Sequence, residues 1–228
     1  MKYKKYYAKN LKTGENMEIW DLYDEYGNNL NLSHRRGDEI PENCFHLVVH
    51  IWIKNKQDKF LITKRSANRE SFPNMFETVG GSVLQGETSL NAAVREVFEE
   101  VGLKFNEKSL KIIHNEVRKE YMGKKFNDIL TAYIVDYSGE INLADATTDE
   151  VSGFKWLDLD EIKKLLDDGV FVASHEYIFS AFKKFQNAQE KIKKLKKDKQ
   201  KSKYNRDKSK YFDYYDDIKH GSHKVIDW

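Results

Sequence analysis

The chain has 228 residues, of which 39 are Lys or Arg and 37 are Asp or Glu, so its formal net charge is only +2. This length suffices for one domain with a full core plus an appendage, or for two small domains. No apolar run approaches the ~20 residues of a membrane span, and the N-terminus lacks the apolar segment of a signal peptide. A single cysteine, Cys44, excludes an internal disulfide, so we expect a cytoplasmic protein without membrane contact.

The charge is unevenly distributed along the chain. Residues 183–228 hold 15 Lys and Arg against 7 Asp and Glu, which gives this segment +8 and leaves −6 for residues 1–182. The sequence therefore predicts an acidic folded part followed by a basic extension.

The N-terminal region predicts one small hairpin. Residues 1–16 are a polar lead-in without periodicity, whereas polar and apolar residues alternate over 17–24. The turn signal at 25–29 predicts a return strand near 30–32. Residues 33–37 then predict a basic loop.

Two arginines of that loop leave two interpretations open. The guanidinium groups of Arg35 and Arg36 suit phosphate oxygens, but surface charges in a connector explain them equally well.

Two largely apolar segments, residues 46–53 and 59–65, predict a buried hairpin around a turn at 55–58. His46 and His50 belong to it and are interpreted as structural, because no Cys or His partner follows at metal-ligand spacing.

A polar loop over residues 66–74 precedes a short predicted strand, 75–79, that enters the glycine pair Gly80 and Gly81. Glycines there allow a tight bend and let main-chain groups face a ligand. Arg65 and Arg69 flank the loop and are the preferred candidates for binding substrate phosphate.

An acidic helix is predicted from residue 88 to residue 101. Its apolar positions recur at helical spacing: Leu90, Ala93, Val94, Val97 and Val101. Glu96, Glu99 and Glu100 share the other face, where like charges repel. With Glu87 at the entrance, this arrangement favours a hard divalent cation with oxygen ligands.

The rest of the folded part alternates strands and helices. Residues 109–120 and 126–137 predict a hairpin, 151–157 predict a strand, and the acidic start at 158–161 predicts a helix N-terminus. A longer helix is expected from Ser174.

The C-terminal extension has lysines next to a tyrosine-rich stretch, 211–215. Such a composition can bind RNA or single-stranded DNA, but a solvated, partly helical extension is favoured over nucleic-acid binding.

One spacing carries a family resemblance. The chain has Gly, five residues, Glu, seven residues, and then Arg-Glu, an apolar residue, any residue, Glu-Glu, any residue, Gly and an apolar residue, from Gly81 to Leu103. This resembles the Nudix box at every fixed position. The resemblance implies an α/β fold of the Nudix type, an α/β/α sandwich with a mixed sheet, over residues 17–188. Residues 1–16 would be the lead-in, and 189–228 a basic helical or flexible extension.

The resemblance also implies a chemistry. Nudix enzymes typically hydrolyse a diphosphate (pyrophosphate) bond in a nucleoside diphosphate linked to another group, or in a related organic diphosphate, with Mg²⁺ or Mn²⁺ and an activated water. The substrate would be a small molecule, and a homodimer is compatible with the family.

Residue by residue, the resemblance implies the following set: Glu99 and Glu100 as main metal ligands, Glu96 as ligand or base, Glu87 at the edge of the metal site, the Gly81 carbonyl as a further ligand, and Arg95 orienting a glutamate. Some relatives recruit a carboxylate from beyond the box. Glu150, with Asp149, is the candidate here, although an ordinary acidic turn explains the pair.

Two rival functions stay open. Residues 18–24, 34–37, 46–50 and 60–65 resemble the Nudix branch often grouped with isopentenyl-diphosphate isomerases. Those isomerases place a catalytic cysteine shortly before the box, where residues 66–76 have none, so hydrolysis is favoured. A Nudix-like binding module for RNA or a protein partner is the second rival, and the intact box glutamates argue against it.

Overall fold

The computed structural model describes residues 7–9, 16–121 and 124–201. The chain divides into two compact units, with the boundary between His175 and Glu176. The described helices include none that is both long enough and apolar enough to cross a membrane.

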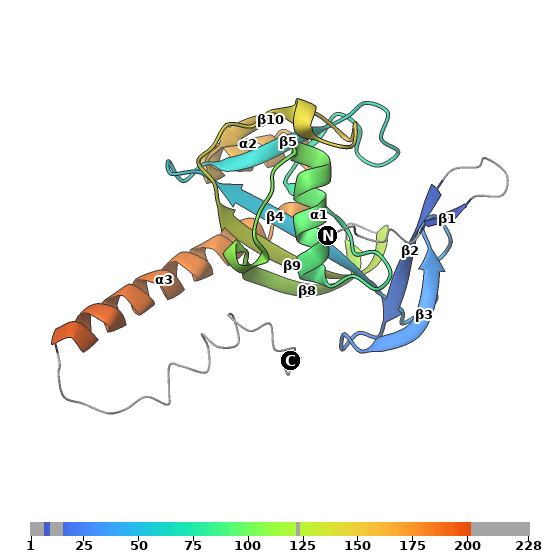
Figure 1. Cartoon of the computed structure of the whole chain (residues 1–228), viewed down its shortest axis with the longest axis horizontal. Helices are drawn as coiled ribbons and strands as arrows, with labels where there is room; N and C mark the ends of the chain where they lie inside the picture. The colour runs from blue at the N-terminus through green and yellow to red at the C-terminus, as the bar shows by residue number, and fades with distance from the viewer. Residues whose placement is uncertain (1–6, 10–15, 122–123, 202–228) are drawn as a thin grey trace. The chain divides into compact units, whose positions relative to one another are not determined.

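The first unit is built on a seven-stranded mixed sheet (Figure 1), whose main path runs in the order β10-β5-β4-β9-β8. Its strands are β4 (His46–Lys54), β5 (Phe60–Arg65), β6 (Phe76–Glu77), β7 (Val79–Ser82), β8 (Lys111–Tyr121), β9 (Lys124–Asp136) and β10 (Val151–Leu157). β4 and β9 are parallel, and the other pairs are antiparallel. This mixed sheet with its helices confirms the predicted α/β class.

The strand expected over residues 75–79 is split in two. β6 pairs with β5, whereas β7 pairs with β4. The chain changes partner at the buried Thr78, whose hydroxyl donates a hydrogen bond of 2.6 Å to the carbonyl oxygen of Ile51 on β4. The glycine pair thus lies on β7, next to the middle of the sheet.

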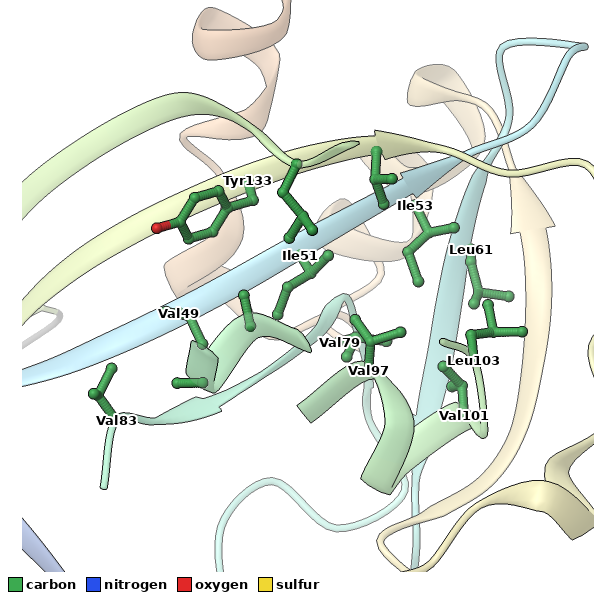
Figure 2. Packing of buried hydrophobic residues seen from close by; sticks show 14 residues of the cluster. Val49, Ile51, Ile53, Leu61, Val79, Val83, Val97, Val101, Leu103 and Tyr133 are labelled. Atoms are coloured by element: carbon green, nitrogen blue, oxygen red, sulfur yellow. The ribbon is translucent and has the colours of Figure 1, made fainter. Parts of the chain in front are cut away.

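Helix α1 (Ser89–Val101) packs its apolar face on this sheet and closes the main core (Figure 2). The core side chains come from α1, β4, β5, β7 and β9, and include Val49, Ile51, Leu61, Val79, Val97, Val101 and Tyr133. In Figure 1, α1 lies in front of the sheet and α2 (Leu159–Asp167) lies behind it, packed against β10. The predicted start of α2 is confirmed, because Asp158 and Glu161 form a capping box there.

A second, three-stranded antiparallel sheet contains β1 (Tyr7–Lys9), β2 (Asn16–Tyr23) and β3 (Asn29–Arg35). The predicted hairpin is confirmed, but β3 continues three residues into the segment expected to be a basic loop. His34 lies in this strand and is buried, with its ring centroid 5.9 Å from that of Trp20. β1 also forms where no element was predicted.

The second unit contains helix α3 (Ile178–Lys201). The helix expected from Ser174 begins later, because a 3-10 turn, η3 (Ala173–His175), comes first. Two other short turns, η1 (Glu107–Ser109) and η2 (Leu143–Asp145), connect elements of the first unit. The tyrosine-rich stretch 211–215 lies outside the described residues.

Candidate active site

The glutamates share one face of α1 because of their spacing of three and four residues, and both ends of the helix are capped. The Thr88 hydroxyl accepts a hydrogen bond from the Asn91 amide at the N-terminus. Gly102 ends the helix with φ at 72°, a left-handed conformation that glycine adopts without strain. With Val97 and Val101 buried in the core, the predicted acidic face lies against β7 and the loop that follows it.

Arg95 binds three of the box glutamates at once. Its Nε lies 2.9 Å from Oε1 of Glu87, and its Nη1 lies 2.8 Å from Oε1 of Glu96 and 3.0 Å from Oε2 of Glu99. Nη2 donates a 2.9 Å hydrogen bond to the Ser82 carbonyl. Burial lowers the pKa of Arg95, but the Glu96 and Glu87 carboxylates more than offset this and raise it. The predicted orienting role of Arg95 therefore has a direct geometric basis.

The Glu96 carboxylate lies against the backbone of β7 at Gly81. A Cβ atom at Gly81 would overlap the carboxylate of Glu96, so glycine at this position lets the carboxylate approach the strand. Burial raises the pKa of Glu96 to about 7, against the opposing effect of Arg95.

Glu100 is the least compensated carboxylate of the site. Its Oε1 accepts a long hydrogen bond of 3.4 Å from the Gly80 amide, and its buried Oε2 has no hydrogen-bond partner among the described residues. Burial, followed by the charges of Glu96 and Glu77, raises its pKa well above the ordinary value. A buried carboxylate without a partner is costly, so the site lacks positive charge.

These oxygens have the donor chemistry of a Mg²⁺ or Mn²⁺ site. Within the described ranges no three acidic, His or Cys side chains already stand in the arrangement of a metal site. Glu87, Glu96 and Glu99 are instead ion-paired with the Arg95 guanidinium. The orphaned oxygen of Glu100 and the surplus of carboxylates fit a divalent cation.

Arg65 and Arg69, the predicted phosphate ligands, lie beside the same cluster and are ion-paired. Arg65 pairs with Glu77, and Nη2 of Arg69 lies 2.9 Å from Oε2 of Glu150. Both partner carboxylates contribute to the raised pKa of Glu100, so Glu150 belongs to the electrostatic environment of the site.

Three residues of the site were missed by sequence reasoning. Glu77 lies in a short strand without a recognisable motif. Glu18 on β2 contributes to the raised pKa of Glu96, although the two residues are 78 positions apart in the sequence. The Thr148 hydroxyl donates a 3.0 Å hydrogen bond to the Glu99 carbonyl, which fixes the loop that carries Glu150. No local pattern marks such contacts, since they depend on the tertiary fold.

For Arg36, the sequence allowed either phosphate binding or a role as a surface charge. It pairs with Glu18 at 2.9 Å, and the charges of Glu150 and Glu96 contribute to its raised pKa, although burial opposes them. This arginine, which directly follows β3, thus lies within the electrostatic range of the glutamate cluster.

The family model of the NUDIX domain matches residues 45–178. The chain is 32% identical over 162 residues to an uncharacterized Nudix hydrolase of Listeria innocua, lin0387, covering 68% of this chain and 89% of that protein. It is 26% identical over 149 residues to an isopentenyl-diphosphate delta-isomerase of Klebsiella pneumoniae, covering 64% of this chain and 78% of the relative.

Among solved structures, DR0079 from Deinococcus radiodurans is similar with a TM-score of 0.57 at 22% identity. The similarity covers 68% of this chain and 92% of that one, and it supports the fold. The chain therefore belongs to the Nudix family of hydrolases, which act on pyrophosphate bonds.

Proposed function

We propose that this protein hydrolyses the diphosphate bond of a nucleoside diphosphate linked to another group, or of a related organic diphosphate, with Mg²⁺ or Mn²⁺. One observation carries the proposal: three box glutamates share Arg95 as their ion-pair partner, whereas the buried Oε2 of the fourth, Glu100, has no hydrogen-bond partner among the described residues. A divalent cation would compensate the negative charge of these carboxylates, and it would also neutralise the oxygens of a bound diphosphate.

Glu99 and Glu100 would hold the metal, with Glu96, the Gly81 carbonyl and the more distant Glu87 completing the set. The bound cation would neutralise the diphosphate oxygens and lower the pKa of a water molecule. Glu96 is the proposed base: it would accept the proton from the water whose oxygen attacks phosphorus, while the bond from phosphorus to the leaving oxygen breaks. Arg95 orients these carboxylates.

Arg65 and Arg69 remain the proposed ligands of the substrate phosphate. In the structure each arginine is ion-paired with a carboxylate. To bind a diphosphate, each guanidinium would have to contact the phosphate in addition to this carboxylate or in place of it. Glu150, released from Arg69, would then be available to the metal site as the additional carboxylate.

Isomerisation is the alternative function, because isopentenyl-diphosphate isomerases are among the relatives. The only cysteine of the sequence, Cys44, is buried ahead of β4, outside the 66–76 segment where a catalytic cysteine would be expected. This supports hydrolysis. The intact glutamate set likewise argues against a pure binding module.

The function is tested by incubating the full chain and Mg²⁺ with ADP-ribose, dinucleoside polyphosphates, nucleoside triphosphates and isopentenyl diphosphate. Product mass identifies the reaction, because hydrolysis of a linked diphosphate yields two phosphate monoesters, whose phosphate is released only after phosphatase is added. Glu99→Gln and Glu100→Gln should retain the fold and lose at least about 100-fold of activity, since ligand charge is removed from the site. Glu140→Gln, an exposed carboxylate after β9, is the matched control. Full turnover by both site variants, or an allylic isomer without phosphate release, would contradict hydrolysis at this site.

A further inference from the structure

The loop that carries Glu87 is held in part by a strand from outside the central sheet. Residues 83–88 connect β7 to α1. The amides of residues 84–87 all donate hydrogen bonds, and two of their acceptors belong to β2. β2 is part of the three-stranded sheet (Figure 1) and precedes the residues that the family model matches, 45–178. The loop is therefore supported by a part of the chain that the family pattern does not cover.

Two residues of the loop close a tight turn. The Leu84 amide donates to Oε2 of Glu87 at 3.1 Å, and the Glu87 amide donates to the Leu84 carbonyl at 3.0 Å. The two amides between them, those of Gln85 and Gly86, find no acceptor within the turn and bond elsewhere.

β2 supplies both of these acceptors. The Ile19 carbonyl accepts the Gln85 amide, and Oδ2 of Asp21 accepts the Gly86 amide, each at 2.8 Å. Nε2 of Gln85 also donates to the Ser33 hydroxyl on β3. Gly86 has φ at 74°, and glycine restricts its own backbone least, so its place depends on the bond to Asp21. A carboxylate makes a stronger acceptor than a carbonyl, which makes Asp21 the main contact.

β2 is itself fixed to the central sheet on either side of Asp21. The Trp20 ring stacks on that of His46 on β4, with centroids 4.0 Å apart and an interplanar angle of 11°. The main chains of Tyr23 and Phe45 exchange two hydrogen bonds, of 2.8 and 2.9 Å. The Asp21 carboxylate therefore projects from a strand that is anchored next to it on both sides.

The position of the loop matters because Glu87 belongs to the ion-pair network of the candidate site. Its carboxylate lies 2.9 Å from Nε of Arg95, whose Nη1 contacts both Glu96 and Glu99. A turn that shifts at Gly86 carries Glu87 with it, and Arg95 then loses a partner that orients its guanidinium. Because the same guanidinium contacts Glu96 and Glu99, the arrangement of these carboxylates depends on the turn.

We propose that Asp21 is a positioning residue of this hydrolase: by accepting the Gly86 amide it holds Glu87 against Arg95 and keeps the glutamates arranged for a divalent cation. This inference rests on the proposed function, in which the glutamates bind the metal. Asp21 acts only through the loop and takes no part in bond cleavage.

Binding of Mn²⁺ to the full chain, measured by electron paramagnetic resonance of the free ion, tests the inference without turnover. Asp21→Ala removes the acceptor and should weaken Mn²⁺ binding about tenfold. Asp21→Asn keeps an oxygen acceptor and should bind within about threefold of wild type.

Asp24→Ala is the matched control for the stability of the hairpin. Asp24 accepts the Tyr26 and Asn28 amides in the turn between β2 and β3. Its removal weakens the same hairpin without touching the loop, so Mn²⁺ affinity should stay that of the wild type.

Steady-state kinetics separates positioning from a loss of folded protein. Asp21→Ala should require about tenfold more Mg²⁺ for half-maximal rate, with kcat at saturating Mg²⁺ within about threefold of wild type. A protein that is merely destabilised would lose rate in proportion to its folded fraction, at an unchanged Mg²⁺ requirement.

Wild-type Mn²⁺ affinity in Asp21→Ala, or equal weakening by Asp21→Ala and Asp24→Ala, would overturn the inference and leave the proposed hydrolysis standing. Equal weakening by Asp21→Asn and Asp21→Ala would overturn it too, because the charge of Asp21 rather than its hydrogen bond would then be responsible.

Hydrogen exchange followed by NMR distinguishes this inference from the proposed function. The Gly86 amide should exchange at least about tenfold faster in Asp21→Ala than in wild type or Asp24→Ala, because its acceptor is gone. Unchanged exchange would refute the inference whatever the metal result. If the wild type binds no Mn²⁺ and hydrolyses no diphosphate, the proposed function fails, and faster exchange would still support Asp21 as the residue that positions the loop.

Discussion

Gly81 shows at the scale of one residue how the box pattern depends on the fold. We expect Gly81→Ala to reduce diphosphate hydrolysis at least about 100-fold, because its Cβ would displace the Glu96 carboxylate from its position against β7. Steady-state kinetics with thermal unfolding measures the effect. Gly153→Ala is the control, since a Cβ at Gly153 meets no atom within 4 Å and should leave the rate unchanged. Wild-type kinetics in Gly81→Ala would refute the close approach.

His46 gives a pH dependence of stability. Burial, then the charges of Arg118, His34 and Arg36, lower its pKa from 6.5 to about 3 in the folded state. The unfolded state therefore binds more protons below pH 6.5, so the free energy of unfolding should fall as the pH is lowered from 6.5 towards 3. At pH 5 this histidine alone should cost about 2 kcal/mol relative to pH 7.

Urea denaturation of wild type and His46→Phe at the two pH values isolates this effect. The variant should lose about 2 kcal/mol less on acidification, because it cannot be protonated in the unfolded state. His175, whose pKa burial also lowers to about 3, remains in both proteins and contributes equally. Identical losses would show that His46 is not buried as a neutral group.

The sequence located the main glutamates because their spacing is local. Glu96, Glu99 and Glu100 lie within two turns of one helix, and the pattern around them is recognisable without tertiary structure. The positions of Glu77 and Glu18 followed only from the fold. The ion pairs of Arg65 and Arg69 were equally invisible, and their roles at the substrate remain predictions.

At the scale of elements, two helix ends offer a matched comparison. Gly102 after α1 and Gly169 after α2 have φ values of 72° and 69°. A Cβ at Gly102 would lie 2.6 Å from the Cβ of Asp145, whereas one at Gly169 meets nothing within 4 Å. Gly169→Ala should therefore cost about 1 kcal/mol for the left-handed backbone alone, and Gly102→Ala clearly more.

Equilibrium unfolding in urea measures both variants, with activity as a second measurement. Gly102→Ala should also lower activity, because η2 would move away from the end of the helix that carries the glutamates. Equal destabilisation by the two substitutions would contradict the contact with Asp145.

Elements with a strong hydrophobic period were predicted well. Residues 151–157 form β10 over the expected range, and the acidic helix begins one residue later than predicted and ends at the predicted residue. The failures have physical causes. The division into β6 and β7 was not predicted, because the two strands pair with different partners and the local sequence does not specify strand partners. β1 was not predicted because it forms by pairing with β2 over only three residues.

At the scale of the whole molecule, the box and the main core both lie in the first unit, which ends at His175. Removal of residues 200–228 should therefore leave the rate constant for hydrolysis within about tenfold of that of the full chain. Kinetics and melting temperature of the truncated and full chains provide the comparison. A collapse of activity at unchanged stability would mean that the extension completes the site.

The main-chain carbonyl of Glu99 accepts hydrogen bonds from the amides of Thr147 and Thr148, at 3.0 and 3.1 Å. The last turn of α1 thus holds the loop that ends at Glu150. As a consequence, these two amide protons report on the helix that carries the box glutamates, although they lie outside it. Any ligand that stiffens α1 at Glu99 should slow their exchange with deuterated solvent, whether or not it contacts either threonine.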